Sequence, residues 1–267
     1  MPDWWEEKWG YNKSVWDDHA NLDPDNDALN NIEECYTDKW DSNPFIKDIF
    51  IEVDWFESSV GEIDSNKPTE KYINKLENVF SDHEINIHID NGCMGGGEQL
   101  EDISEFYYWE LRDIYWDNFL HNDLNNPRKG IFHYCFVTDY GPYPGFGGFA
   151  FFGWDHLDSW EIAGQRVDEN HPLKNKQHVI LSIIMHELGH NMGLLSDDCG
   201  GNDNLPATKT FSRQWFKYFP YQSIMNYMFT YWILDYSDGS RGKNDYDDWS
   251  NLEFDFFKDS HFEWPKD

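Results

Sequence analysis

Polar and hydrophobic residues alternate over 48–55 and again over 84–90, and this period of two predicts a pair of β-strands. Between them, apolar residues recur every three or four positions after Pro68, which is the spacing of an amphipathic helix opened by proline. Three later apolar runs predict further strands: 130–140, 146–152 and 159–167.

Helices are predicted at 102–121, which is rich in aromatic residues, and at 177–190, which is almost wholly apolar. Because strands alternate with helices along the chain, we expect a mixed α/β (α+β) fold in which helices back a twisted sheet.

Composition limits the kinds of partner. The chain has 267 residues, enough for one sizeable domain, and 18% of them are aromatic, as expected of a folded chain. The formal net charge of −31 disfavours nucleic acid and anionic membranes as partners. No apolar run approaches the roughly 20 residues that span a bilayer, so no membrane span is expected.

The apolar helix predicted at 177–190 ends in the motif H-E-x-x-H, formed by His186, Glu187 and His190. A spacing of four residues places both histidines on one face of a helix, where their imidazoles can bind the same zinc ion. Glu187 would lie beside them as the general base for a water that zinc activates. Burying two histidines and a glutamate in an apolar helix would cost free energy unless a metal ion bound them.

Two further features narrow the class. Gly193 extends the motif to H-E-x-x-H-x-x-G, and Met225 lies 35 residues after His190 in the run Ser-Ile-Met-Asn-Tyr. Together these motifs resemble the metzincin zinc metallopeptidases, whose Met-turn packs beneath the metal. The resemblance implies an upper subdomain that runs to about residue 193 and a smaller lower one over 194–267, which would hold the Met-turn and a last helix at 245–257. It also implies that Tyr227 acts as a zinc ligand or stabilises the oxyanion; a purely structural role stays open.

The third metal ligand is where the chain departs from the metzincin pattern. Ser196 stands where that pattern has its ligand, and serine binds zinc poorly. We favour the carboxylate of Asp203, which follows a Gly-Gly turn, and then that of Asp197. Cys199 is a third, weaker candidate.

Residues 1–45 form an acidic segment ahead of the predicted catalytic domain at 46–267. A twelve-residue loop within the segment carries carboxylates at positions 1, 3, 5 and 12, the spacing of a calcium-binding loop. The loop is similar to EF-hand and thrombospondin type 3-like repeats, although Ala28 replaces the usual glycine. The expected calcium ligands are Asp23, Asp25, Asp27 and Glu34. A solvated acidic loop is the alternative.

The four cysteines include no C-x-x-C pair, so a structural zinc site is not expected, while two disulfides or four free thiols both remain open. No signal peptide is visible, yet zinc, calcium and an acidic surface favour an extracellular or cell-surface location. We expect a monomer.

The functional prediction is a zinc-dependent endopeptidase that acts on a protein or peptide substrate. Its cleft would hold the substrate in extended form along the predicted edge strand at 146–152. A non-catalytic binding or surface-layer module stabilised by metal and calcium is the alternative. A hydrolase of non-peptide amides is a third possibility.

Overall fold

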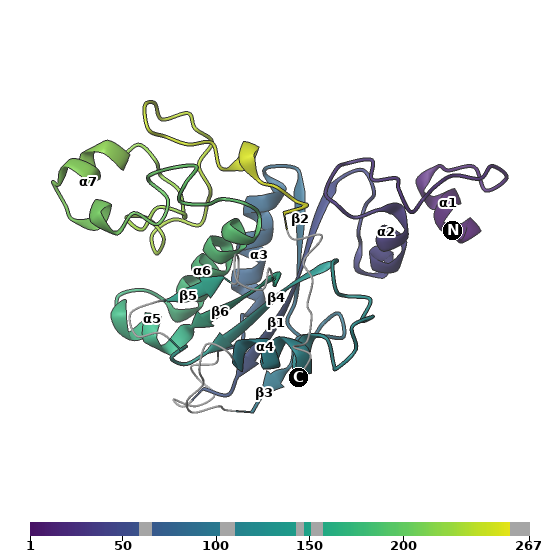
Figure 1. Cartoon of the computed structure of the whole chain (residues 1–267), viewed down its shortest axis with the longest axis horizontal. Coiled ribbons are helices and arrows are strands. Elements are labelled where there is room, and N and C mark those ends of the chain that lie inside the picture. Colours follow the sequence, from purple (N-terminus) through teal and green to yellow (C-terminus); the bar gives the residue numbers. More distant parts are fainter. Residues whose placement is uncertain (59–65, 102–109, 143–146, 151–156, 257–267) are drawn as a thin grey trace, which may run out of the picture.

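A computed structural model shows the expected mixed α/β fold, with a central sheet between layers of helices (Figure 1). It describes the following residues: 1–58, 66–101, 110–142, 147–150 and 157–256. Helix α1 (Asp3–Trp9) of the acidic N-terminal segment and helix α7 (Arg213–Tyr218) lie at opposite ends of the long axis.

The sheet has the strand order β2-β1-β4-β6-β5. Its strands are β1 (Lys47–Phe56), β2 (Ile85–Asp90), β4 (Phe132–Thr138), β5 (Gly148–Ala150) and β6 (Ser159–Ala163), and the short β3 (Gln99–Leu100) pairs with the end of β1. All pairs are parallel except that of β5 with β6. Among the described residues β5 pairs with β6 alone, so it forms one edge of the sheet.

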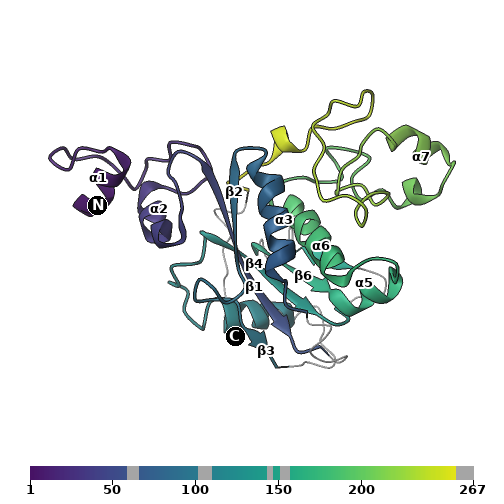
Figure 2. The ribbon, with the colours of Figure 1, turned by 180° about the vertical axis from the view of Figure 1, so that it is seen from behind.

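β1 is buried along almost its whole length because helices cover both faces of the sheet. Ile49, Ile51 and Val53 share one face and pack with the helices α3 (Glu70–Ser81) and α6 (Lys176–Asn191). Phe50 and Phe56 share the other face and pack with α4 (Leu111–Ile114) and the π-helical turn η4 (Tyr115–Phe119). Figure 2 shows α3 and α6 side by side over the sheet.

Regular structure is sparse outside this body. The N-terminal segment contains α1 (Asp3–Trp9), α2 (Asn31–Thr37) and the 3-10 turn η1 (Asp38–Trp40). The region after α6 contains the 3-10 turn η5 (Leu205–Thr208), helix α7 (Arg213–Tyr218) and the 3-10 turn η6 (Trp249–Asn251). Loops therefore build most of the molecule on the side of the sheet that α7 occupies in Figure 1.

The strand predicted at 159–167 is wrong in its second half, because β6 stops at Ala163 and helix α5 (Gly164–Asn170) begins at once. A side chain at Gly164 would come within 3.2 Å of the Val137 side chain in β4, so glycine lets the new helix start close to the sheet. The helix predicted at 102–121 begins outside the described residues, and its described part forms α4 and η4.

The helix predicted at 245–257 is wrong within the part that the structure describes, where only η6 forms. Two side chains of this segment instead make contacts with distant parts of the chain. The Trp249 indole stacks on His83 with ring centroids 3.8 Å apart, and the Asp248 carboxylate accepts a hydrogen bond from Tyr221 at 2.7 Å.

Candidate functional site

Helix α6 carries the H-E-x-x-H residues and lies in the middle of the core. The side chain of Asn175 accepts a hydrogen bond from the amide of Gln177 and so caps the start of the helix. From Val179 to Asn191 every residue is buried, so the helix is apolar on all sides except where its last turns carry His186, Glu187 and His190.

Backbone carbonyls fix the tautomers of both histidines. The Nδ1 of His186 lies 2.9 Å from the carbonyl oxygen of Ile224, and the Nδ1 of His190 lies 2.8 Å from that of Leu194. Because a carbonyl can only accept, each Nδ1 carries a hydrogen, so Nε2 is the nitrogen of each ring that can bind a metal once it has lost its own proton. A metal-binding histidine is usually oriented in this way by its second nitrogen.

The carboxylate of Asp203 lies against the Nε2 atoms of both histidines. One of its oxygens lies 3.2 Å from Nε2 of His186, and the other lies 3.3 Å from Nε2 of His190. The potential ligand atoms of the three residues all lie within 4.8 Å of one another. Two imidazole nitrogens and one carboxylate are a donor set that suits zinc in a catalytic site, so these residues fit the metal.

The turn after α6 brings Asp203 back over the helix. Gly193 adopts a left-handed conformation, φ +82°, and the amide of Leu194 donates to the carbonyl of Gly189 at 2.8 Å. The buried side-chain amide of Asn202 then donates to the carbonyl of Leu194 at 2.9 Å. Asp203 itself has φ +51°, a strained conformation for a residue with a side chain.

Met225 packs directly against α6 between the two histidines. A side-chain carbon at Gly189 would lie 2.6 Å from the Met225 sulfur, so only glycine leaves room for the methionine side chain at this position. The carbonyl of Ile224, next to Met225, is the acceptor for His186. The loop around Met225 therefore sets both the floor of the site and the orientation of one ligand.

Mutual charge and hydrogen bonding shift the pKa values in the cluster. Burial lowers the pKa of His186, but the hydrogen bond and negative charge of Asp203 outweigh burial and raise the pKa to about 9. Burial raises the pKa of Asp203, yet hydrogen bonds from the two imidazoles hold it well below its usual value. The carboxylate is therefore ionised, and it supplies the negative charge that a divalent cation needs.

Glu187 lies next to the cluster and against β5. Its carboxylate is so close to Gly148 that a side-chain carbon there would approach it to 2.6 Å. Burial raises the pKa of Glu187 above its usual value, while the two histidines and a hydrogen bond with the backbone of Ala150 lower it. A carboxylate with a raised pKa is suited to accept and then release a proton.

A cavity of about 600 Å³ opens beside Glu187. Its lining comes from five parts of the chain: Gly147 and Gly148 at the start of β5, His171 after α5, the helix α6, the turn η5 and the loop over 227–232. This volume is in the range of sites that bind small molecules or a large side chain.

Tyr227 lines the same cavity, and its ring stacks on His186 with centroids 5.6 Å apart. Burial raises the pKa of Tyr227, and the charge and hydrogen bond of Asp203 add to this effect. The hydroxyl therefore stays protonated and can donate a hydrogen bond.

The other candidates for the third ligand lie elsewhere. Ser196 and Asp197 are exposed and do not belong to the cluster. Cys199 is buried, and its sulfur accepts a hydrogen bond from the amide of Gly201. All four cysteines are free thiols.

The acidic loop forms a second cluster at the start of β1. Its members are Asp23, Asp25, Asp27, Glu34 and Asp48, in two groups whose carboxylate oxygens lie within 4.8 Å of one another and which share Asp27. Asp48, from β1, was not among the residues predicted from sequence. It stands near the start of β1, the first strand after the loop, and this proximity in sequence is the one signal that could have indicated it.

The acidic cluster contains buried carboxylates without donors. Both carboxylate oxygens of Asp25 and of Glu34 are buried without a hydrogen-bond partner, and Glu34 is only 1% exposed. The nearby Ser42 hydroxyl donates to the backbone carbonyl of Glu34. Burial raises the pKa of Glu34 to about 9 and that of Asp27 to about 7.

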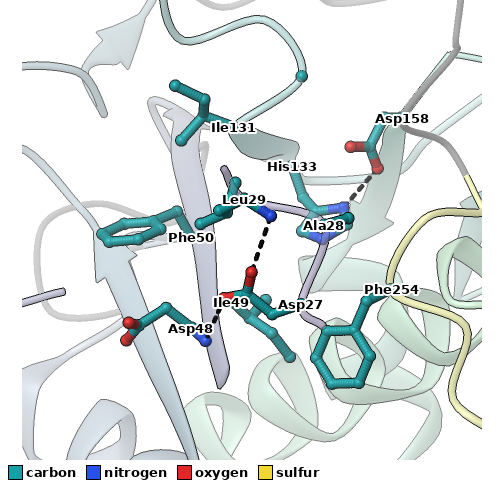
Figure 3. Close-up of a pocket in the computed structure, with 11 residues that line it drawn as sticks. Asp27, Ala28, Leu29, Asp48, Ile49, Phe50, Ile131, His133, Asp158 and Phe254 are labelled. Atoms are coloured by element: carbon teal, nitrogen blue, oxygen red, sulfur yellow. Dashed lines mark hydrogen bonds and ion pairs between the residues drawn. The ribbon is translucent and has the colours of Figure 1, made fainter. Parts of the chain in front are cut away.

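Backbone geometry in this loop matches a tight turn around an ion. Ala28 has φ +73°, so it adopts the conformation for which glycine is normally used. Asp27 accepts hydrogen bonds from the amides of Leu29 and Asp48, which join the loop to β1 beside a cavity of about 30 Å³ (Figure 3).

Comparisons with protein-family models, with curated proteins and with solved structures find no match to this chain. Among the described residues, no helix is both long and apolar enough to cross a membrane. The functional argument therefore depends on the chemistry of the two clusters.

Proposed function

We propose that this chain is a zinc-dependent endopeptidase of the metzincin type. The observation that supports it is the convergence of two histidine Nε2 atoms, on rings that are each oriented by a backbone carbonyl, on the Asp203 carboxylate beside a buried glutamate. His186, His190 and Asp203 would hold the zinc. When bound, zinc would polarise the peptide carbonyl and activate a water molecule.

The chain's own residues would supply the remaining chemistry. Glu187 would accept the proton of the attacking water and pass it to the nitrogen of the leaving amine. The Tyr227 hydroxyl, a protonated donor in the cavity, would stabilise the negative charge that develops on the carbonyl oxygen. The edge strand β5 would pair with the backbone of an extended substrate next to Glu187.

The decisive variant is Glu187→Gln, which keeps the size of the side chain and removes the base. We expect casein cleavage to fall by at least about a thousandfold while zinc, measured by metal analysis, stays at one ion per chain. Glu57→Gln, at an exposed glutamate after β1, is the matched control and should cleave normally. Undiminished cleavage by Glu187→Gln would contradict the proposal. One bound zinc with no cleavage of any peptide by the unaltered chain would instead favour a non-catalytic module.

We also propose that the acidic cluster binds calcium and fastens the N-terminal segment to β1. Four buried carboxylate oxygens on Asp25 and Glu34 lack any donor, and oxygen ligands of this kind are what calcium prefers. Calcium should raise the melting temperature of the unaltered chain and leave that of Glu34→Gln nearly unchanged. Asp82→Asn, at an exposed residue after α3, should respond to calcium as the unaltered chain does. An equal response of Glu34→Gln would exclude the site.

A further inference from the structure

Four aromatic side chains lie on and beside helix α7, and three of them are exposed while Trp215 is half-buried. They are here called the α7 patch: Phe211, Trp215, Phe216 and Phe219. Phe211 is 76% exposed and Phe216 is 62% exposed. The rings contact one another, with centroids 4.8 Å apart for Trp215 and Phe219 and 5.5 Å apart for Phe211 and Trp215. Contiguous exposed aromatic surface is uncommon on soluble proteins and marks interaction sites.

The charge of this region is opposite to that of the rest of the chain. Residues 204–234 contain no aspartate or glutamate, although the whole chain has 51 acidic residues and a formal net charge of −31. The same stretch contains Lys209, Arg213 and Lys217, which stand before or within α7. The α7 patch is therefore an aromatic surface with positive charge on an otherwise acidic molecule.

Phe211 holds a strained conformation while most of its side chain faces solvent. Its φ is +62°, and a bulky residue rarely adopts this left-handed region. Strain of this kind persists where the surrounding structure maintains it, and it is concentrated at functional sites. Burial of the ring does not explain the strain, because the side chain is largely exposed.

The α7 patch is continuous with the cavity beside Glu187. Leu205 and Thr208 of η5 line that cavity, and η5 also packs against α7. The Ser212 hydroxyl, at the start of α7, donates to the carbonyl of Pro206 in η5. A polypeptide with one side chain in the cavity can therefore continue over η5 onto the patch.

We propose that the α7 patch is a docking surface for the polypeptide substrate and that it selects extended segments combining apolar and acidic side chains. Aromatic rings supply contact area, and the lysines and arginine attract carboxylates. An anionic bilayer fits less well, because it would also face the acidic body, whereas a single extended chain contacts only the patch. The proposal rests on the proposed peptidase function, but docking can be measured without cleavage.

The test measures binding of fluorescently labelled β-casein, an unfolded chain that is both acidic and apolar, to the Glu187→Gln protein by anisotropy. On this background, Phe216→Ala should weaken binding about tenfold. Arg213→Glu combined with Lys217→Glu should weaken binding by a similar factor. This loss of binding should be smaller at high salt, because salt screens the charges. Trp16→Ala, at an exposed aromatic residue in the N-terminal segment, is the matched control and should bind normally.

Phe211→Gly separates docking from folding, because it removes both the ring and the left-handed strain. We expect its melting temperature to rise by about 3 °C while β-casein binding weakens about tenfold. Unchanged binding of Phe216→Ala and Phe211→Gly would overturn the proposal. Loss of vesicle binding in these variants, with β-casein binding intact, would assign the patch to a membrane and would also overturn it. If β-casein binds through the patch but no variant or unaltered chain cleaves it, docking stands and the peptidase proposal fails.

Discussion

The backbone amide of Asp203 donates a hydrogen bond to the carbonyl of Met225 at 3.1 Å. This contact joins the loop that follows α6 to the loop that carries the methionine under the site. It also holds Asp203 in its left-handed conformation, with its carboxylate toward the two histidines. The position of the Asp203 carboxylate therefore depends on a residue that lies 22 positions further along the chain.

Asp203→Ala should lower zinc affinity by at least about a hundredfold, because it removes one of three ligands and the only negative charge among them. Competition with a chromogenic chelator measures this affinity. Asp197→Ala removes an exposed carboxylate from the same loop and should leave the affinity unchanged. If the effects of the two variants were reversed, Asp197 would be the ligand.

Tyr227→Phe should reduce kcat by about a hundredfold with little change in KM, because the hydroxyl would act mainly on charge that develops during the reaction. Zinc content should stay at the level of the unaltered protein. Tyr231→Phe removes another hydroxyl at the cavity and provides the comparison. A loss of zinc in Tyr227→Phe would instead show that the hydroxyl acts through Asp203.

Ala28→Gly should raise the free energy of unfolding by about 0.5–1 kcal/mol, because glycine adopts the left-handed conformation of this position without steric cost. Urea unfolding in the presence of calcium measures the change. Ala20→Gly, at an exposed position whose φ is not positive, should lower stability instead. Equal losses in both variants would mean that the turn at Ala28 carries no strain.

Glu161 should make the protein less stable as pH rises. It is buried in β6, where its carboxylate accepts a hydrogen bond from Thr138 at 2.5 Å, and burial raises its pKa from 4.5 to about 8. Between these values the folded chain keeps a proton that the unfolded chain has lost. Its contribution is therefore complete below pH 4.5 and is lost as pH approaches 8.

Glu161→Gln keeps an oxygen that can accept the Thr138 hydroxyl and removes the ionisation. Relative to the unaltered protein, it should gain about 3–5 kcal/mol in free energy of unfolding between pH 5 and pH 8. Urea unfolding at a series of pH values measures the difference in free energy of unfolding between the two proteins. The contributions of the other buried acids are the same in both and cancel in this difference. Parallel pH profiles would show that Glu161 does not titrate in this window.

Local spacing was enough to predict α6 and the shared face of its two histidines, because four residues make about one turn of any helix. It was also enough for β1 and β2, whose alternating apolar residues lie on one face of the sheet and pack in the core with α3 and α6. Asp203 could not be distinguished from Asp197 in this way. The position of Asp203 depends on the turn at Gly193 and on a hydrogen bond to Met225, and the residues around Asp203 in the sequence indicate neither.

Asp48 and the last predicted helix illustrate the same limit. Asp48 reads as an ordinary polar residue of an alternating strand until the fold places it against Asp27 and Glu34. The aromatic and acidic residues at 245–256 have helical spacing, but Trp249 and Asp248 bind partners on α3 and on the loops, so tertiary contacts override the local preference.

The hydrogen bond from the amide of Asp48 to Asp27 has a consequence for the order of folding. Strand β1 is central, and its parallel partners begin only at Ile85 and Phe132, so those pairings must close long loops. The contact with Asp27 closes a short loop and needs only residues that are already synthesised when β1 leaves the ribosome. Calcium present at that moment would fix the first residues of β1 against the loop before the sheet exists. Refolding should therefore be faster with the ion than without it.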